Sequence, residues 1–248
     1  MHSYLTAITV LLLVGGCSGG SAIHRAAKTH NRCGAEYLAS GELDAAETRF
    51  RLALEYAPDF PEVLNNLGLV AMARGQLDEA HVLFRRAVRR RADFSQAQNN
   101  LGRVKQLLGD NRGAESRFRR ALEVDPAFWE ARRNLGRLLI AERRLDPAMV
   151  ELRKLCEIEP GSAEARLDLG VAYLLAGSGA EATASLKRAI RLDPNLAEAH
   201  YNLGLVLFRE GRFAAAADAF SAALAVRPDF SEARHNLVAA RSAARVQR

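Results

Sequence analysis

Five asparagines recur along this chain at multiples of one interval. They are Asn66, Asn100, Asn134, Asn202 and Asn236. Four of them open the triplet Asn-Leu-Gly, and Asp168 opens the same triplet with a carboxylate in place of the amide. A primary amide can donate a hydrogen bond to a carbonyl and accept one from an N–H group. A row of such amides is therefore a candidate binding surface.

The other polar residues show no catalytic arrangement. The six histidines lack the spacing of metal ligands, and the Gly177-Ser178-Gly179 cluster is a turn rather than a phosphate-binding loop. Paired carboxylates such as Asp78 and Glu79 fit the start of a helix, where they favour the helix dipole. We therefore expect no enzyme activity, no cofactor, no metal site and no small-molecule substrate.

The interval that separates the asparagines is the period of the whole chain. Glycines stand at 34, 68, 102, 136, 170 and 204, so each step is 34 residues with no insertion or deletion. If each of these glycines is position eight, then position 20 is always alanine, position 24 is always phenylalanine or leucine, and position 32 is proline in five units. A fixed period of this length indicates stacked structural repeats.

The repeated unit resembles the tetratricopeptide repeat. The resemblance is carried by residues 195–204, followed by Gly211 and Ala216, and it extends over 27–230. It implies an all-α, right-handed superhelical solenoid of six helix–turn–helix repeats, whose first helices line a concave face. The repeats are 27–60, 61–94, 95–128, 129–162, 163–196 and 197–230, and we expect residues 231–248 to form a C-terminal capping helix. Because no linker interrupts the period, we expect one domain.

The resemblance offers two interpretations of the asparagines. In peptide-binding tetratricopeptide proteins, a ladder of amides holds the backbone of an extended peptide. The alternative is that Asn-Leu-Gly is only the consensus of the repeat. Both interpretations can hold together.

Two further sets of residues vary along the predicted groove. An apolar set in the last two repeats predicts a partner-binding patch, because exposed apolar patches commonly mark interaction sites. It consists of Leu167, Val171, Leu174, Tyr201, Leu205 and Phe208. A basic set at the centre, Arg103, Arg133 and Arg137, could bind an acidic side chain or a C-terminal carboxylate. The alternative for the apolar set is that neighbouring helices cover part of it.

The N-terminus does not follow the repeat. Residues 5–14 are apolar, uncharged and too short for a permanent membrane span. They lead into Val14-Gly15-Gly16-Cys17, which resembles the lipobox of bacterial lipoproteins. The resemblance implies a signal peptide over 1–16, acylation of Cys17, and a lipid anchor with a short linker over 17–26. Ser18 then implies the periplasmic face of the outer membrane. The alternative is an ordinary signal peptide with an incidental cysteine.

The net charge of +6 includes a crowded group of arginines in one predicted second helix. These are Arg85, Arg86, Arg89, Arg90 and Arg91. The structural interpretation is a solvated surface, and the functional interpretation is contact with anionic lipid head groups. We expect no nucleic-acid partner for an exported protein, despite the basic charge.

A lipoprotein with six such repeats resembles the pilotin family of type IV pilus biogenesis. That resemblance implies a non-catalytic protein that supports outer-membrane localisation and assembly of the secretin. It also implies that a secretin subunit binds in the concave groove. One alternative is a general periplasmic scaffold for peptidoglycan, cytochrome or secretion machinery. A regulatory subunit of an enzyme is a third class.

Overall fold

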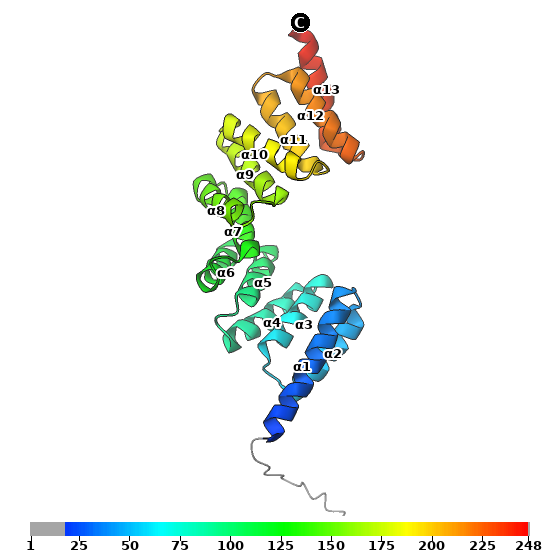
Figure 1. Ribbon diagram of the computed structural model, residues 1–248, viewed down its shortest axis with the longest axis vertical. Coiled ribbons are helices and arrows are strands. Elements are labelled where there is room, and N and C mark those ends of the chain that lie inside the picture. Colours follow the sequence, from blue (N-terminus) through cyan, green and yellow to red (C-terminus); the bar gives the residue numbers. More distant parts are fainter. Residues whose placement is uncertain (1–17, 248) are drawn as a thin grey trace, which may run out of the picture. The chain divides into compact units, whose positions relative to one another are not determined.

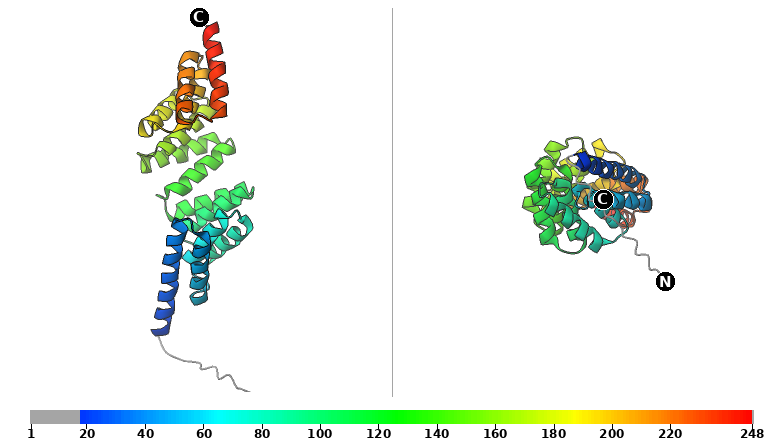
Figure 2. Two further views of the ribbon diagram at one scale, coloured as in Figure 1. Left: turned by 90° about the vertical axis from the view of Figure 1, so that its right-hand side faces the viewer. Right: turned by 90° about the horizontal axis from the view of Figure 1, so that it is seen from below.

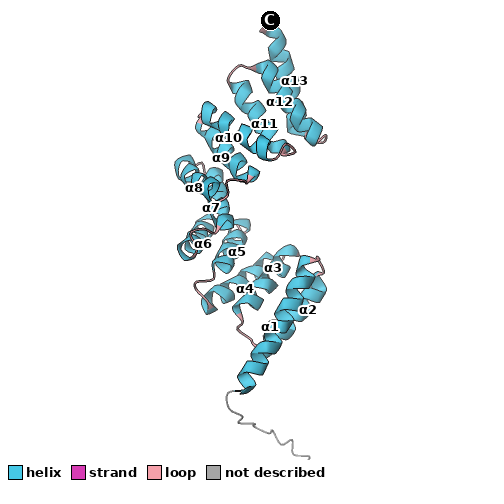
Figure 3. Cartoon of the chain, in the orientation of Figure 1, coloured by secondary structure: helices cyan, strands magenta, loops and turns pink. Residues whose placement is uncertain are grey.

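The computed structural model describes the backbone of residues 18–247 and the side chains of residues 24–247. Every element in this part of the chain is an α-helix, and it contains no strand (Figure 3). The helices are α1 (Ser18–Ala39), α2 (Leu43–Tyr56), α3 (Pro61–Ala73), α4 (Leu77–Arg90), α5 (Ser95–Leu107), α6 (Asn111–Val124), α7 (Trp129–Ala141), α8 (Leu145–Ile158), α9 (Ala163–Ala176), α10 (Gly179–Leu192), α11 (Ala197–Arg209), α12 (Phe213–Val226) and α13 (Ser231–Val246). The predicted all-α fold class is confirmed.

The helices fall into two compact units that divide between Ala92 and Asp93. The first unit contains α1 to α4 and the second contains α5 to α13 (Figure 1). Within each unit, consecutive helices pack side by side as hairpins, which Figures 1 and 2 show from different directions. In the second unit, α13 packs on α12 beyond the last hairpin.

A glycine ends the turn of most hairpins. Gly41, Gly75, Gly109, Gly177 and Gly211 have φ angles between 73° and 83°. This left-handed conformation costs a residue with a Cβ atom about 1–2 kcal/mol, whereas glycine adopts it freely. The fourth repeat places Arg143 at the same position, with a φ of 61°. Arg143 is therefore a strained residue in an otherwise regular series.

We expect Arg143→Gly to stabilise the fold by about 0.5–1 kcal/mol. The gain is smaller than the full strain because glycine also makes the unfolded chain more flexible. Thermal or urea unfolding followed by circular dichroism measures the change. The matched control is Gly177→Ala, which should lower the unfolding midpoint, and an unchanged or lowered midpoint for Arg143→Gly would contradict the argument.

The core of each repeat is built on one close contact between its two helices. A Cβ atom placed on Gly68 would lie 2.6 Å from the ring of Phe84, and one on Gly136 would lie 2.7 Å from Leu152. Phe84 and Leu152 are fully buried. Positions 20 and 27 of the same two repeats are also buried, and they hold alanine except for Leu155 at position 27 of the fourth repeat. The small residues let the helices approach, and the large residue fills the space between them.

The first helix is longer than its repeat. Helix α1 begins at Ser18 and runs through residues 18–26, where the sequence analysis expected a linker. No proline interrupts this segment, and Ala22, Ile23 and Ala26 are compatible with a helix. Cys17 and the proposed signal peptide lie outside the described residues. None of the described helices has the length and apolar character that crossing a membrane requires.

Candidate functional site: the surface of the first helices

The first helices of successive repeats lie against one another in both units. Helix α1 contacts α3 in the first unit, and α5, α7, α9 and α11 form a contacting series in the second. Second helices make no comparable contacts with each other among the described residues. The first helices are therefore the crowded, inner layer of each unit, and their free face is the candidate binding surface.

The asparagines at position six join adjacent first helices. The Nδ2 atom of Asn66 donates to Oδ1 of Asn31 at 3.0 Å, and the Nδ2 atom of Asn134 donates to Oδ1 of Asn99 at 2.8 Å. In both pairs the partners are 35 residues apart, so position six of one repeat binds position five of the repeat before it. Asn100 is buried and also interacts with other groups of the protein.

Where position five changes, the amide changes its partner. Leu167 offers Asn202 no polar group, and Asn202 donates instead to the backbone carbonyl of Glu198 at 2.8 Å. Asn236 donates to the hydroxyl oxygen of Tyr201 at 3.1 Å. One N–H of each of these amides is thus used within the protein. A primary amide has a second N–H and a carbonyl oxygen, and the peptide-binding role of the ladder stays a prediction.

The basic centre contains one paired arginine and two exposed ones. Arg133 donates from Nε to Oδ2 of the buried Asp168 at 2.7 Å. Burial raises the pKa of Asp168, and the hydrogen bond from Arg133 opposes this rise. Arg103 and Arg137 are exposed and make no ion pair within the described part of the chain. These two guanidinium groups are therefore the available positive charges of this surface.

The predicted apolar patch is narrower in the structure than the sequence suggested. Leu167 and Leu174 are 9% and 5% exposed and belong to the core of the second unit. Val171, Tyr201, Leu205 and Phe208 pack against the same core but stay partly exposed. Neighbouring helices thus cover two of the six side chains, which was the alternative considered above.

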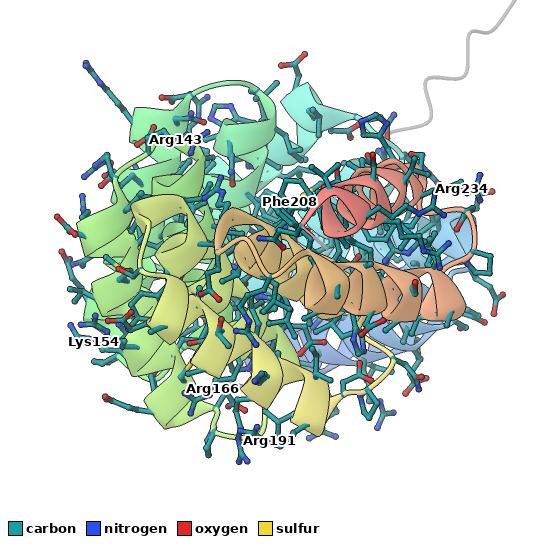
Figure 4. All side chains as sticks on the ribbon, turned by 90° about the horizontal axis from the view of Figure 1, so that it is seen from above. Arg143, Lys154, Arg166, Arg191, Phe208 and Arg234 are labelled. Atoms are coloured by element: carbon teal, nitrogen blue, oxygen red, sulfur yellow. The ribbon has the colours of Figure 1, made fainter. Side chains whose placement is uncertain are left out.

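Aromatic neighbours that sequence reasoning missed hold this patch in place. The ring of Phe208 lies 5.1 Å from that of Phe213, edge to face, and the ring of Tyr201 lies 4.8 Å from that of Phe230. Leu237 of α13 packs against the same core. Figure 4 shows Phe208 toward the middle of the view, with Arg191 and Arg234 at its edge. The sequence signal for this cover is the apolar Leu237 within 231–248, the segment that is expected to form the capping helix.

The described residues contain no group of histidines, cysteines and carboxylates that could hold a metal ion. The surface of the first helices therefore offers amides, two unpaired arginines and four apolar side chains. This chemistry suits a polypeptide ligand, whose backbone pairs with amides and whose side chains meet apolar and charged positions.

Models of the tetratricopeptide repeat match residues 37–103, 99–162 and 197–230, and a model described as TPR repeat matches 176–211. Together these matches cover most of the chain. The chain is a tetratricopeptide repeat protein. No curated protein matches its sequence. Proteins of this family are typically scaffolds that bind other proteins, which agrees with the chemistry of the inner surface.

Solved structures share the tetratricopeptide fold at low sequence identity. The structure of Pseudomonas aeruginosa pilF has a TM-score of 0.77 at 16% identity and covers 86% of this chain and 97% of its own. A chain of the APC/C hetero-tetramer Cut9–Hcn1 has a TM-score of 0.74 at 19% identity over 90% of this chain. This chain spans only 44% of that longer one. YrrB, described as a TPR protein with an unusual peptide-binding site, has a TM-score of 0.63 at 22% identity, with coverages of 75% and 96%.

Proposed function

We propose that this tetratricopeptide protein is a lipid-anchored, non-catalytic pilotin that supports localisation and assembly of an outer-membrane secretin. The observation that carries the proposal is the inner surface of the second unit. There, the partly exposed Val171 and Leu205 occupy the repeat position that Arg103 and Arg137 occupy on earlier helices, and the partly exposed Phe208 follows Leu205 on the same helix. Such a surface favours a segment that carries acidic residues at one end and apolar residues at the other.

The fold that this chain shares with P. aeruginosa pilF supports the pilotin proposal. The match to the P. aeruginosa pilF structure covers 97% of that chain and 86% of this one. The Cut9–Hcn1 chain continues well beyond the match. The lipobox-like Val14-Gly15-Gly16-Cys17 supports the anchor, since the acyl chains of a lipidated cysteine together bind a membrane firmly.

The mechanism is retention by two attachments. The groove holds a segment of the secretin subunit through apolar anchors and charge pairs, and the remaining N–H groups of the asparagines bind its backbone. The acyl groups on Cys17 hold the same molecule at the membrane. A secretin subunit bound in this way stays concentrated at the membrane where it assembles, because tethering raises its effective concentration.

We expect Cys17→Ala to release the protein into the soluble periplasmic fraction and to reduce secretin multimers at the outer membrane. The reason is that the substitution removes the only acylation site that the lipobox defines. Membrane fractionation measures the release of the protein, and detection of secretin multimers in the outer membrane measures their loss, with a gene deletion as the reference for complete loss.

Cys33→Ala is the matched control, because Cys33 is half-buried in the first repeat and should change neither readout. Unchanged fractionation of the Cys17 variant would contradict the lipid anchor. Normal multimers in the deletion strain would contradict the pilotin function and favour a scaffold for another envelope complex.

A further inference from the structure

The first unit carries a second surface, which the proposed function does not use. A cavity of about 700 Å³ lies between the first turns of α1 and the end of α4, and its lining includes His24, Lys28, Arg90 and Arg91. A smaller cavity of about 370 Å³ adjoins it and is lined by Asp59, Arg86, Arg89 and Arg90. We refer to Lys28, Arg86, Arg89, Arg90 and Arg91 as the basic patch.

The basic patch has more cations than its carboxylates neutralise. Asp59 pairs with Arg86 at 3.7 Å and with Arg90 at 2.8 Å, and Glu62 pairs with Arg91 at 2.7 Å. Lys28 and Arg89 have no ion pair within the described part of the chain. Five cations therefore face two carboxylates on an exposed surface. This excess of positive charge is complementary to an anionic partner that carries several charges.

Part of the lining of the larger cavity is apolar. Pro58, Phe60 and Pro61 line it, and the ring of His24 lies 5.4 Å from that of Phe60. Basic side chains beside apolar ones are complementary to a lipid surface, where phosphates lie next to glycerol and acyl groups. A wholly hydrated acidic protein segment would bury no apolar surface against Pro58, Phe60 and Pro61.

The position of the patch on the chain agrees with this partner. Lys28 comes ten residues after Ser18 on one continuous helix, and a rise of 1.5 Å per residue places it about 15 Å along the axis. The lipobox-like cysteine directly precedes that helix. An acylated Cys17 would therefore keep Lys28 within about 15 Å of the anchor, and close to the head groups when the helix lies along the membrane surface, where charge attraction is effective.

We propose that the basic patch contacts anionic phospholipid head groups. The inference rests on the proposed lipid anchor for its biological setting. It adds a second membrane contact, which fixes the orientation of the first unit as well as its attachment. Each lysine or arginine close to an anionic surface strengthens binding by about fivefold, so the two unpaired cations together account for on the order of 20-fold.

Vesicle cosedimentation of the full chain that carries Cys17→Ala tests this contact without acylation. The vesicles contain either phosphatidylcholine alone or phosphatidylcholine mixed with phosphatidylglycerol. We expect Lys28→Gln/Arg89→Gln to weaken binding to the mixed vesicles on the order of 20-fold. Binding to phosphatidylcholine alone should be equal for all variants, and added salt should reduce the difference.

Lys187→Gln/Arg188→Gln is the matched control, since it removes two exposed cations from α10 in the second unit. It should bind the mixed vesicles as the parent does. Equal binding by the two double variants would overturn the inference, as would equal binding to vesicles with and without phosphatidylglycerol. The lipid anchor is tested separately by fractionation of Cys17→Ala. If that variant is released from membranes while the vesicle test fails, the proposed anchor stands and only the basic patch is rejected.

Discussion

Phe208→Ala is expected to weaken binding of the secretin subunit by roughly thirtyfold or more. Phe208 is a partly exposed aromatic residue on the inner layer of the second unit, and its ring is fixed by edge-to-face contact with Phe213. An aromatic side chain that is already positioned loses little entropy on binding, and its truncation at the centre of an interface can cost about 2 kcal/mol or more. Isothermal titration calorimetry with purified secretin subunit measures the loss.

Tyr201→Ala should act in the same direction, because Tyr201 lies two turns earlier on α11 and belongs to the same apolar patch. Val150→Ala is the matched control. Val150 is 47% exposed on the second helix α8, so its truncation removes apolar surface outside the inner layer. Full affinity of both aromatic variants, with unchanged helical circular dichroism, would place the binding site elsewhere.

Repeat geometry was predictable because a single period carries it. The 34-residue spacing of glycine, alanine and the large apolar residue fixes which side chains meet inside each hairpin, and Gly136 against Leu152 follows the same rule as Gly68 against Phe84. These contacts join residues within one repeat, so the sequence pattern contains both partners. The helical fold class therefore followed from the sequence.

Contacts between repeats were harder to predict. The Asn134–Asn99 hydrogen bond joins positions six and five of neighbouring first helices, and it depends on how closely these helices approach. Periodicity gives the spacing of the asparagines but not that approach, so the inward use of their N–H groups was not foreseen. Leu167 and Leu174 were placed on an open face for the same reason, although the adjacent helices bury them.

The terminal helices α1 and α13 extend beyond the repeat pattern, so their packing is harder to predict from the sequence. Helix α1 continues back to Ser18, and α13 places Leu237 against the core below the apolar patch. Residues 18–26 of α1 and the whole of α13 lie outside the six full repeats, so the repeat pattern does not describe them. The cover that α13 gives to Tyr201 through Asn236 accordingly appears only in the structure.

Among the position-eight glycines of the second unit, Gly204 makes the closest approach, which is to Phe220. A Cβ atom on Gly204 would lie 2.5 Å from the ring of Phe220, which is closer than real Cβ atoms come to other heavy atoms. Phe220 is fully buried and its ring is rigid, so it has little freedom to move away. Any larger residue at this position must push α11 and α12 apart.

We expect Gly204→Val to destabilise the second unit by about 3 kcal/mol, at the upper end of the cost of overpacking a core. Valine has a better helix propensity than glycine, but that gain is only a few tenths of a kcal/mol and does not offset the clash. For a unit of this size the midpoint of thermal unfolding should fall by roughly 6–12 °C. Circular dichroism at 222 nm, which follows helix content, measures this midpoint.

A double-mutant cycle separates this clash from a general effect of valine. Removing the ring with Phe220→Ala makes room for the new side chain, so the double variant should be less destabilised than the sum of the single variants by about 1–3 kcal/mol. Ala214→Val, at an exposed position of α12, controls for the helix propensity of valine and should change the midpoint little. If the effects of Gly204→Val and Phe220→Ala simply add, the close approach of the two helices is not what requires glycine at position eight.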